Sequence, residues 1–245
     1  MNFIYLISRE WSAKILQKLI NDKSIKFKKK LVFYTDERYI KKLKLLKNEK
    51  KKIKIKNLDR QLRLIKKFNP NIIFAFGWNE FLTKKIRKIA PCFVLHPSKL
   101  PKFRGGSPIQ NQLIRGVKIS AVSIIMASDN IDSGDIFFQK KISFTGYLED
   151  IHKEIISKGF YGAKIILDNF SKEKLNPIKQ NENLATYYKR RTPDMSEIHP
   201  SDFKKYSAEF FFNLIRGLQK PYPEAFIKCK DNSKLYFEKV YFKNN

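Results

Sequence analysis

A histidine stands where a short apolar run gives way to a loop rich in proline and glycine. The run is residues 92–95, Cys-Phe-Val-Leu, and His96 opens the sequence HPSKLPKFRGGSPIQNQLIRG that follows it. Ligands of open α/β sheets bind where loops leave the carboxyl ends of the strands. Imidazole changes its charge near neutral pH without help from its surroundings. Because the sequence contains only three histidines, His96 is a candidate for acid–base chemistry.

The loop after the histidine contains residues that restrict the backbone and residues that start a helix. Pro97 and Pro101 each fix a backbone dihedral, which orders the loop before a ligand arrives. The glycines at 105–106 permit close approach of the backbone to another group. Ser107 and Pro108 are typical of a helix N-cap and its first position. An ordinary connector with a surface histidine is the alternative, and residue types alone do not separate the two.

A second polar segment, residues 130–136, lies between two strand-like runs. Its sequence, Asn-Ile-Asp-Ser-Gly-Asp-Ile, has the composition of an ordinary hairpin turn. The strand before it would neighbour the strand that ends at His96, which brings Asp132 within reach of the imidazole. A carboxylate beside an imidazole orients the ring. A plain turn and a His96–Asp132 pair are therefore both consistent with this segment.

Apolar runs alternate with amphipathic segments along the first part of the chain. This alternation predicts parallel βαβ units in a doubly wound α/β domain with a mostly parallel sheet. The predicted strands are residues 3–7, 31–34, 53–55, 72–76 and 92–95. The predicted helices are residues 11–20, a lysine-rich helix through Leu43 and Leu46, residues 58–68 and residues 81–89.

The pattern changes after the central loop. Residues 119–126 and 136–142 are strand-like, and residues 148–170 form a long amphipathic pattern that predicts a helix. A polar stretch after Lys172 suggests a boundary, so we expect a catalytic domain over residues 1–178. Residues 179–245 would form a small α+β appendage. Its expected elements are a helix over residues 203–218 and strands over residues 225–229 and 235–242.

Several classes of protein are disfavoured by the sequence. The first strand-to-helix turn, Ser8-Arg9-Glu10-Trp11, has no glycine, whereas a dinucleotide-binding turn needs one. The sequence also lacks a GxxxxGK[ST] phosphate loop. The two cysteines, Cys92 and Cys229, are far apart, which argues against a disulfide framework or a zinc site and fits a reducing compartment.

The same composition bears on location and partners. No window approaches the roughly 18 apolar residues of a membrane span, and the first residues predict a strand and not a signal peptide. We therefore expect a cytoplasmic protein that does not bind membranes. The net charge of +28 fits either a lysine-rich composition or nucleic-acid binding, and we favour the first, because many lysines fall in solvated helices and turns.

Together these segments resemble the formyltransferase family that uses 10-formyltetrahydrofolate, which includes methionyl-tRNA and sugar N-formyltransferases. The resemblance rests on HPSKLP at 96–101, Arg104-Gly105, Pro108-Ile109 and DSGDI at 132–136, in that order. It covers most of the chain up to Phe170. Similarity continues in TYYKRRTP at 186–193 and PYP at 221–223. The resemblance implies a Rossmann-like fold, 10-formyltetrahydrofolate as co-substrate, and no metal.

The resemblance also assigns roles to individual residues. His96 would stabilise the oxygen of the transferring formyl group or take a proton from the attacking amine, and Asp132 would orient His96 and assist proton transfer. The family has an asparagine two residues before the histidine, where this sequence has Val94. Asn79 and Asn111 are the side chains that could compensate. Folate binding is expected of Ser98, Leu100, Pro101, Ile131 and Asp132.

The acceptor implied by the resemblance is a nucleotide-linked amino sugar. The part of the chain after Leu167 is shorter than the C-terminal barrel of methionyl-tRNA formyltransferases, and RGGSPIQ fits the sugar and tRNA branch better than glycinamide ribonucleotide formyltransferases. We expect a dTDP-linked 4-amino or 3-amino dideoxyhexose that feeds O-antigen or another surface glycan. Arginine matches phosphate geometry, and a tyrosine can stack on a base. The expected substrate-binding residues are Arg104, Gly105, Gly106, Ser107, Tyr187 and Arg190, with Tyr188 and Arg191 beside them.

Other interpretations of the sequence stay open. A truncated methionyl-tRNA formyltransferase would use the basic charge to bind RNA. A binding protein without activity would account for Val94. The pair Arg190-Arg191 would equally suit a solvated basic turn. The two apolar runs near the C-terminus are compatible with a homodimer.

Overall fold

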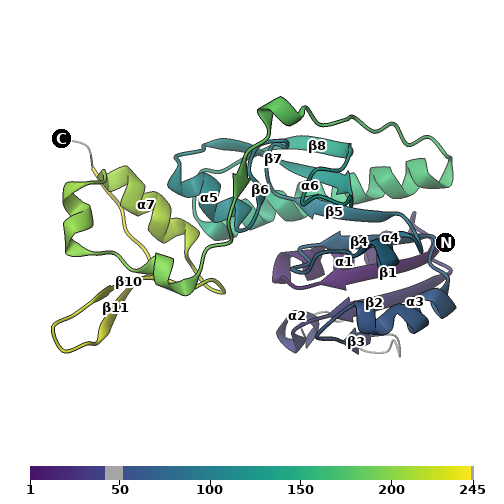
Figure 1. Cartoon of the computed structure of the whole chain (residues 1–245), viewed down its shortest axis with the longest axis horizontal. Helices are drawn as coiled ribbons and strands as arrows, with labels where there is room; N and C mark the ends of the chain where they lie inside the picture. The colour runs from purple at the N-terminus through teal and green to yellow at the C-terminus, as the bar shows by residue number, and fades with distance from the viewer. Residues whose placement is uncertain (42–51, 244–245) are drawn as a thin grey trace.

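A seven-stranded sheet forms the centre of the protein, which a computed structural model describes over residues 1–41 and 52–243 (Figure 1). The strand order is β3-β2-β1-β4-β5-β7-β8. These strands are β1 (Asn2–Ile7), β2 (Lys29–Tyr34), β3 (Lys52–Lys54), β4 (Ile72–Phe76), β5 (Cys92–His96), β7 (Ile119–Met126) and β8 (Ile136–Ser143). The predicted α/β class with a mostly parallel sheet is confirmed.

Parallel and antiparallel pairing divide the sheet into two parts. Strands β3, β2, β1, β4 and β5 pair in parallel, as the alternation of strands and helices predicts. Strand β7 is antiparallel to β5, and β8 is antiparallel to β7. Met126, the last residue of β7, pairs with Phe93, so the turn between β7 and β8 begins at the amino end of β5. Residues 127–135 then fold back toward the carboxyl end of β5, where Asp132 reaches His96.

Helices cover both faces of the sheet, and the alternation of side chains along the strands supplies a core for each face. On one face Phe3, Tyr5 and Ile7 of β1 pack beneath α1 (Glu10–Asn21) and α6 (Leu148–Ser171). On the other face Ile4 and Leu6 pack beneath α3 (Leu62–Phe68) and α4 (Lys84–Arg87). Successive residues of a strand point to opposite faces, so a strand buried on both sides reads as a continuous apolar run.

The helix predicted over residues 81–89 is shorter in the structure. Only Lys84–Arg87 is helical, because Thr83 is extended and its hydroxyl donates to the Asp59 carboxylate at 2.8 Å. Phe81 stays outside the helix and is half exposed. The predicted helix over residues 58–68 is confirmed as a 3₁₀ turn η2 (Asp59–Gln61) followed by α3. Of the predicted lysine-rich helix only α2 (Glu37–Lys41) is described, and Leu43 and Leu46 lie outside the described residues.

The chain after α6 returns along the sheet toward the central loop before it reaches the C-terminal elements (Figure 1). A short strand in this return, β9 (Tyr187–Tyr188), pairs in parallel with β6 (Arg104–Gly105). The helix predicted over residues 203–218 is split into η5 (Pro200–Lys204) and α7 (Ala208–Gly217), since Ser207 caps α7 with a side-chain bond to the Phe210 N–H. The other elements here are η3 (Glu182–Leu184), η4 (Pro193–Ser196), β10 (Ala225–Lys228) and β11 (Lys234–Phe237).

The C-terminal elements are fastened to the sheet domain by packing and by one buried cation. Helix α7 packs against α5 (Pro108–Ile114). The guanidinium of Arg216, buried on α7, donates to the carbonyls of Phe144 and Gly146 at 2.7 and 2.6 Å. The predicted division into residues 1–178 and 179–245 stays a prediction.

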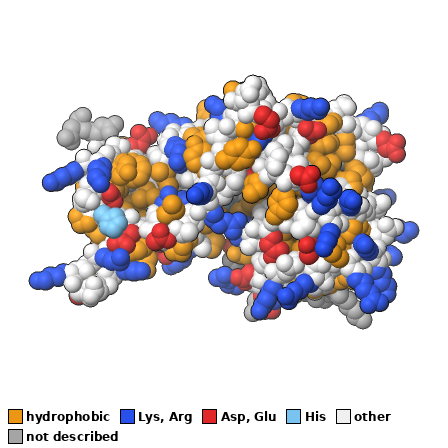
Figure 2. Space-filling view, viewed as in Figure 1, with side chains coloured by type: hydrophobic (Ala, Val, Ile, Leu, Met, Phe, Trp, Pro, Cys, Tyr) orange, Lys and Arg blue, Asp and Glu red, His pale blue; other side chains and the backbone are white. Residues whose placement is uncertain are grey.

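The described helices and the charge on the visible surface bear on the expectations about membranes and nucleic acid. No helix in the described part of the chain is long and apolar enough to span a membrane. Lysine and arginine side chains are spread over the visible face among apolar and acidic ones (Figure 2). On this face the positive charge is therefore dispersed.

His152 on α6 predicts a pH dependence of stability. Burial is the largest cause that lowers its pKa, to about 4 from 6.5, and Lys14 adds to the effect. The unfolded chain binds this proton more readily than the folded chain. The contribution of His152 to the free energy of unfolding, about 3 kcal/mol, is therefore fully present above pH 6.5 and is lost as the pH falls toward 4. Unfolding by urea at a series of pH values should show a shallower loss in His152→Gln.

His199 supplies the matched control for that measurement. Its side chain is 61% exposed, so His199→Gln should keep the acid sensitivity of the wild type. An equal loss of stability between pH 6.5 and 4 in wild type and His152→Gln would contradict the assignment to His152.

Candidate active site

A cavity of about 790 Å³ opens at the carboxyl ends of the central strands. Strand β1 lies between β2 and β4, so the strand order reverses there, and ligands of open α/β sheets bind at such a point. Arg9 follows β1, Trp78 follows β4, and His96 ends β5, and all three line the cavity. The predicted position of the site at the strand ends agrees with this geometry.

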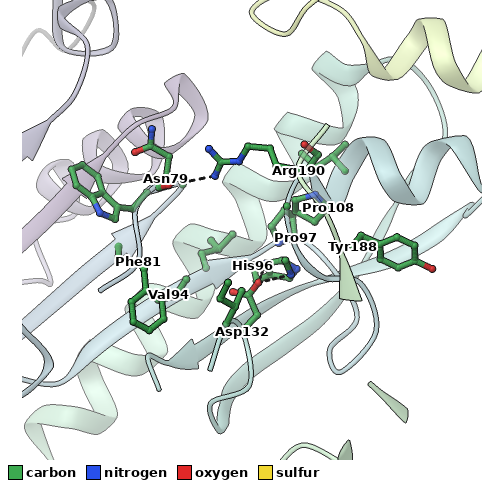
Figure 3. A pocket seen from close by; sticks show the side chains of 18 of the residues that line it. Asn79, Phe81, Val94, His96, Pro97, Pro108, Asp132, Tyr188 and Arg190 are labelled. Atoms are coloured by element: carbon green, nitrogen blue, oxygen red, sulfur yellow. Dashed lines mark hydrogen bonds and ion pairs between the residues drawn. The ribbon is translucent and has the colours of Figure 1, made fainter. Parts of the chain in front are cut away.

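His96 and Asp132 come together in this cavity, as the pairing hypothesis expects (Figure 3). The ring nitrogen Nδ1 of His96 lies 3.3 Å from Oδ2 of Asp132. Both side chains are largely buried, with exposed fractions of 6% and 13%. The same Oδ2 accepts a hydrogen bond from the Gly105 N–H at 2.9 Å. The carboxylate is thereby held between the imidazole and the backbone of β6.

The second ring nitrogen of His96 also meets an oxygen. Nε2 lies 2.7 Å from the carbonyl oxygen of Phe103. A carbonyl can only accept, so this contact requires a hydrogen on Nε2. A contact of Nδ1 with the carboxylate of Asp132 is attractive only if a second hydrogen lies between them. The Phe103 contact therefore assigns a hydrogen to Nε2, and Nδ1 faces the carboxylate of Asp132.

The loop from 97 to 102 has a structural role. The Ser98 hydroxyl donates to the Lys102 carbonyl at 2.7 Å, and the Ser98 carbonyl accepts from Ser123 at 2.6 Å. Leu100 is buried in a small apolar cluster, and its carbonyl accepts from Gln139 at 3.1 Å. None of Ser98, Leu100 and Pro101 lines the cavity, and their predicted role in folate binding stays a prediction.

The two glycines of the loop make room for another part of the chain itself. A Cβ on Gly105, whose φ is +96°, would come within 2.4 Å of the Tyr188 carbonyl oxygen. A Cβ on Gly106 would come within 2.3 Å of the Arg190 Cα. Both glycines still line the cavity through their backbone. The close approach predicted from their composition is therefore an approach of strand β9.

Ser107 precedes α5 but does not cap it. Its φ of 47° is left-handed, and its hydroxyl accepts from the Arg191 N–H at 3.1 Å instead of from the helix. The expected N-cap is thus corrected, because the approach of residues 189–191 takes the hydroxyl. Ser107 lines the cavity, as do the predicted residues Ile131, Tyr187 and Arg190.

Arg104 contradicts the expectation of a phosphate contact. Its side chain is fully buried and does not line the cavity. Its guanidinium donates to both carboxylate oxygens of Glu182 at 2.7 Å, to Gln180 at 2.8 and 3.1 Å, and to the Tyr187 hydroxyl. Glu182 raises the pKa of Arg104, and Arg104 lowers the pKa of Glu182. The cation is satisfied internally and has no donor left for a ligand.

Val94 and His96 lie on the same face of β5, since they are two residues apart. Val94 lines the cavity with an apolar side chain. Asn111 cannot compensate, because its amide donates to the carbonyls of Gly106 and Lys189 at 2.8 and 3.3 Å. Asn79 lies beside Arg190 and apart from the His96–Asp132 pair (Figure 3). Neither asparagine supplies an amide next to the pair.

Arginines form one wall of the cavity. Arg9, Arg190 and Arg191 line it, and their guanidinium groups donate to the backbone carbonyls of Ser8, Asn79 and Met195. Arg9 also makes a side-chain hydrogen bond with Tyr222. Burial lowers the pKa of Arg191, and the neighbouring Arg115 lowers it further, while Asp194 opposes the shift. An anion bound here would offset the unfavourable burial of this charge.

The two tyrosines of β9 differ in direction. Both line the cavity, and the Tyr187 hydroxyl accepts a hydrogen bond from Arg104. The Tyr188 ring points away from the His96–Asp132 pair (Figure 3) and stacks on Phe103 with ring centroids 4.9 Å apart. The guanidinium of Arg115 lies 4.2 Å from the centre of the Tyr188 ring. Stacking on a base is therefore open to Tyr187 but not to Tyr188.

An apolar wall, of which the sequence analysis singled out only Val94 and Ile131, lies in the same cavity as the pair. It follows β4 and continues across β5 and β7, and it is formed by Trp78, Phe81, Leu82, Val94, Ile125, Ala127 and Ile131. Arg9, Gln110 and Tyr222 were also missed as lining residues. The rule that places ligands where the strand order reverses could have found Arg9 and Trp78. In the described residues no cluster of three or more His, Cys, Asp or Glu side chains could hold a metal.

Comparisons with known proteins agree with this geometry. The family model for formyl transferase matches residues 7–157. The bifunctional polymyxin resistance protein ArnA of Wigglesworthia glossinidia brevipalpis is 34% identical over 71% of this chain and 28% of its own length. The chain spans about half the length of the curated methionyl-tRNA formyltransferases it matches.

Two solved structures extend the likeness to the whole chain. The methionyl-tRNA formyltransferase from Clostridium thermocellum is 30% identical, with a TM-score of 0.73 over 99% of this chain and 94% of that one. A 4-N formyltransferase from Francisella tularensis shares the fold, with a TM-score of 0.78, 16% identity and coverage of 100% and 98%. The likeness in fold therefore includes the return segment and the C-terminal elements.

The glycine at 105 gives a test of the site's packing. Gly105→Ala should lower the free energy of unfolding by more than the roughly 1–2 kcal/mol of a left-handed backbone, because its Cβ also meets the Tyr188 carbonyl. Gly116→Ala is the matched control, since Gly116 has a φ of +71° and no neighbour within 4 Å. Equal losses in the two variants, measured by urea unfolding, would contradict the close approach of β9.

Proposed function

The chain belongs to the formyl transferase family, and we propose that it transfers a formyl group from 10-formyltetrahydrofolate to the primary amine of a nucleotide-linked amino sugar. One observation carries this proposal. The His96–Asp132 pair lies in a cavity that has an apolar wall on one side and arginines on another. A flat folate ring suits the first wall, and a diphosphate suits the second.

The apolar wall fits the folate. Trp78, Phe81 and Ile131 offer aromatic and aliphatic surface next to Asp132, and two of them are exposed enough to be covered by a ligand, Phe81 at 50% and Ile131 at 54%. Ligand pockets of about 300–1,000 Å³ bind molecules of this size through mostly apolar contacts and a few polar ones. The cavity of about 790 Å³ has room for both substrates' reacting ends.

The arginine wall fits the acceptor. Arg190 and Arg191 were expected at a diphosphate, and Arg9 joins them from the end of β1. Guanidinium groups bind phosphate oxygens in pairs. Arg104 has no part in this contact, because its guanidinium is bound to Glu182 and Gln180. Tyr187 is 57% exposed and lies where a base could stack on it.

The transfer needs one new bond, one broken bond and one moved proton. The acceptor nitrogen bonds to the formyl carbon, the bond from that carbon to the folate nitrogen breaks, and a proton passes from the first nitrogen to the second. Oδ1 of Asp132 has no hydrogen bond to any residue in the described part of the chain, so it is the oxygen that takes and returns this proton. His96 holds the carboxylate in place.

Val94 stands where the family has an amide donor near the formyl oxygen. A positioned amide donor to a developing oxyanion is typically worth about 3 kcal/mol, and a valine supplies none. Neither Asn79 nor Asn111 replaces it. Both ring nitrogens of His96 face protein oxygens, so the ring does not replace the missing amide as a hydrogen-bond donor either.

Initiator methionyl-tRNA is the second candidate acceptor. It is favoured by the 30% identity to a methionyl-tRNA formyltransferase over 94% of that chain. The dispersed positive charge on the visible face does not form one stripe that would follow an RNA backbone (Figure 2). The arginines that line the cavity suit the phosphates of either acceptor, so the assay must include both.

An assay with purified chain separates the candidates. The protein is mixed with 10-formyltetrahydrofolate and with dTDP- and UDP-linked 3-amino and 4-amino sugars or with charged initiator tRNA, and the formylated product is measured by mass spectrometry. We expect formylation of a nucleotide sugar. Formylation of the tRNA alone would overturn the sugar proposal, and no product with any acceptor would overturn formyl transfer.

His96→Asn is the control variant for the same assay. It removes the group that contacts both Phe103 and Asp132, so turnover should fall by about 10²–10⁴-fold while the chain stays folded. His199→Asn changes an exposed histidine and should keep the wild-type rate. Near-wild-type turnover in His96→Asn would refute the catalytic role.

A further inference from the structure

The segment from Ile178 to Tyr188, here called the strap, contacts the two loops that carry Phe103 and Asp132, whose oxygens lie on either side of His96. At its start, Ile178 exchanges two backbone hydrogen bonds with Ile136 at 2.8 and 2.9 Å. At its end, strand β9 pairs with β6. Between these anchors the strap makes side-chain contacts with each loop. Its conformation therefore bears on the geometry of both loops.

Gln180 of the strap binds the loop that carries Asp132. Its amide nitrogen donates to the backbone carbonyls of Asp132 and Gly134 at 2.9 and 2.7 Å. Asp132 has a left-handed φ of 52°, a conformation that a residue with a side chain adopts at a cost. Two hydrogen bonds on either side of this turn hold the backbone in that conformation. They thereby fix where the carboxylate lies.

Arg104 orients Gln180 for this contact. Its Nε and Nη2 donate to the Gln180 Oε1 at 3.1 and 2.8 Å, which leaves only the amide nitrogen of Gln180 to face the Asp132 loop. Glu182, on the same strap, binds the remaining edge of the guanidinium. A planar guanidinium with five fixed donors suits this task better than an ammonium.

Thr186 of the strap binds the loop that carries the other partner of His96. Its hydroxyl oxygen accepts from the Phe103 N–H at 2.8 Å. Phe103 has a left-handed φ of 61°, and its carbonyl meets Nε2 of His96 at 2.7 Å. The Thr186 carbonyl also accepts from the Arg104 N–H at 2.8 Å. The strap thus holds the oxygen on each side of the imidazole.

We propose that the strap positions the His96–Asp132 pair, through Gln180 on the Asp132 backbone and Thr186 on Phe103, with Arg104 orienting Gln180. Gln180, Thr186 and Arg104 are positioning residues, since none of them touches the reacting atoms. The measurement of turnover rests on the formyl transfer proposed above. The measurement of the His96 ring-nitrogen signals does not depend on that activity.

Gln180→Glu tests the contact with the Asp132 loop. The glutamate keeps an oxygen for Arg104, but it replaces the donor to the two carbonyls with a second acceptor. We expect kcat to fall about 10–100-fold while KM for both substrates changes less than about twofold. The ring-nitrogen signals of His96 in ¹H–¹⁵N spectra, assigned with His96→Asn, should shift. Lys179→Gln, an exposed neighbour on the strap, should match the wild type in both measurements.

Thr186 is exposed, so a second pair of variants can be made there without changing the buried Arg104. Thr186→Val removes the acceptor for the Phe103 N–H at nearly constant shape, whereas Thr186→Ser keeps it. We expect lower kcat and shifted His96 signals in Thr186→Val, and rescue of both in Thr186→Ser. This pair decides the matter even if Gln180→Glu fails to fold.

The outcomes separate the strap from the proposed function. Variants that are less stable but keep the wild-type kcat and the wild-type His96 signals would overturn positioning, because the strap would then be structural only. If the wild type formylates no acceptor, the proposed function fails, and the His96 signals alone decide. Unchanged signals in both Gln180→Glu and Thr186→Val would end the proposal.

Discussion

The position of one imidazole between two oxygens is the constraint on which the site depends. His96 meets the Phe103 carbonyl on one ring nitrogen and the Asp132 carboxylate on the other. The two oxygens belong to loops far apart in the sequence, and each has to arrive at a defined distance. The sheet topology alone does not meet this requirement, because antiparallel β7 places the start of the turn with Asp132 at the amino end of β5. The turn meets it by folding back, which brings Asp132 to His96.

Left-handed backbone conformations gather around this imidazole. Phe103, Ser107 and Asp132 all have a positive φ, between 47° and 61°, although none of them is glycine. Such conformations cost about 1–3 kcal/mol each and persist where the surroundings impose them. Here the surroundings are hydrogen bonds: Phe103 bonds to Thr186, Asp132 to Gln180, and Ser107 to Arg191. Stability elsewhere in the sheet domain thus supports strained loops at the cavity.

Much of the fold followed from the sequence because the strands are buried on both faces and separated by turn residues. The first and last residues of β4 and β7 were predicted as the structure has them. The contact between His96 and Asp132 was one of two alternatives that the sequence left open, and the structure shows it. The role of Arg104 was wrong, since an arginine in a glycine-rich loop looks the same whether it faces a ligand or Glu182. The glycines at 105–106 were predicted to approach something closely, but the partner, β9, lies too far along the chain for local patterns to indicate.

The most direct test of this account is a crystal structure with a stable 10-formyl folate analogue bound. The account predicts that the folate ring lies on the wall of Trp78 and Ile131 and that the formyl carbon lies next to His96 and Asp132. Nε2 of His96 should still meet the Phe103 carbonyl. A formyl group bound away from the pair, among the arginines or outside the cavity, would contradict it.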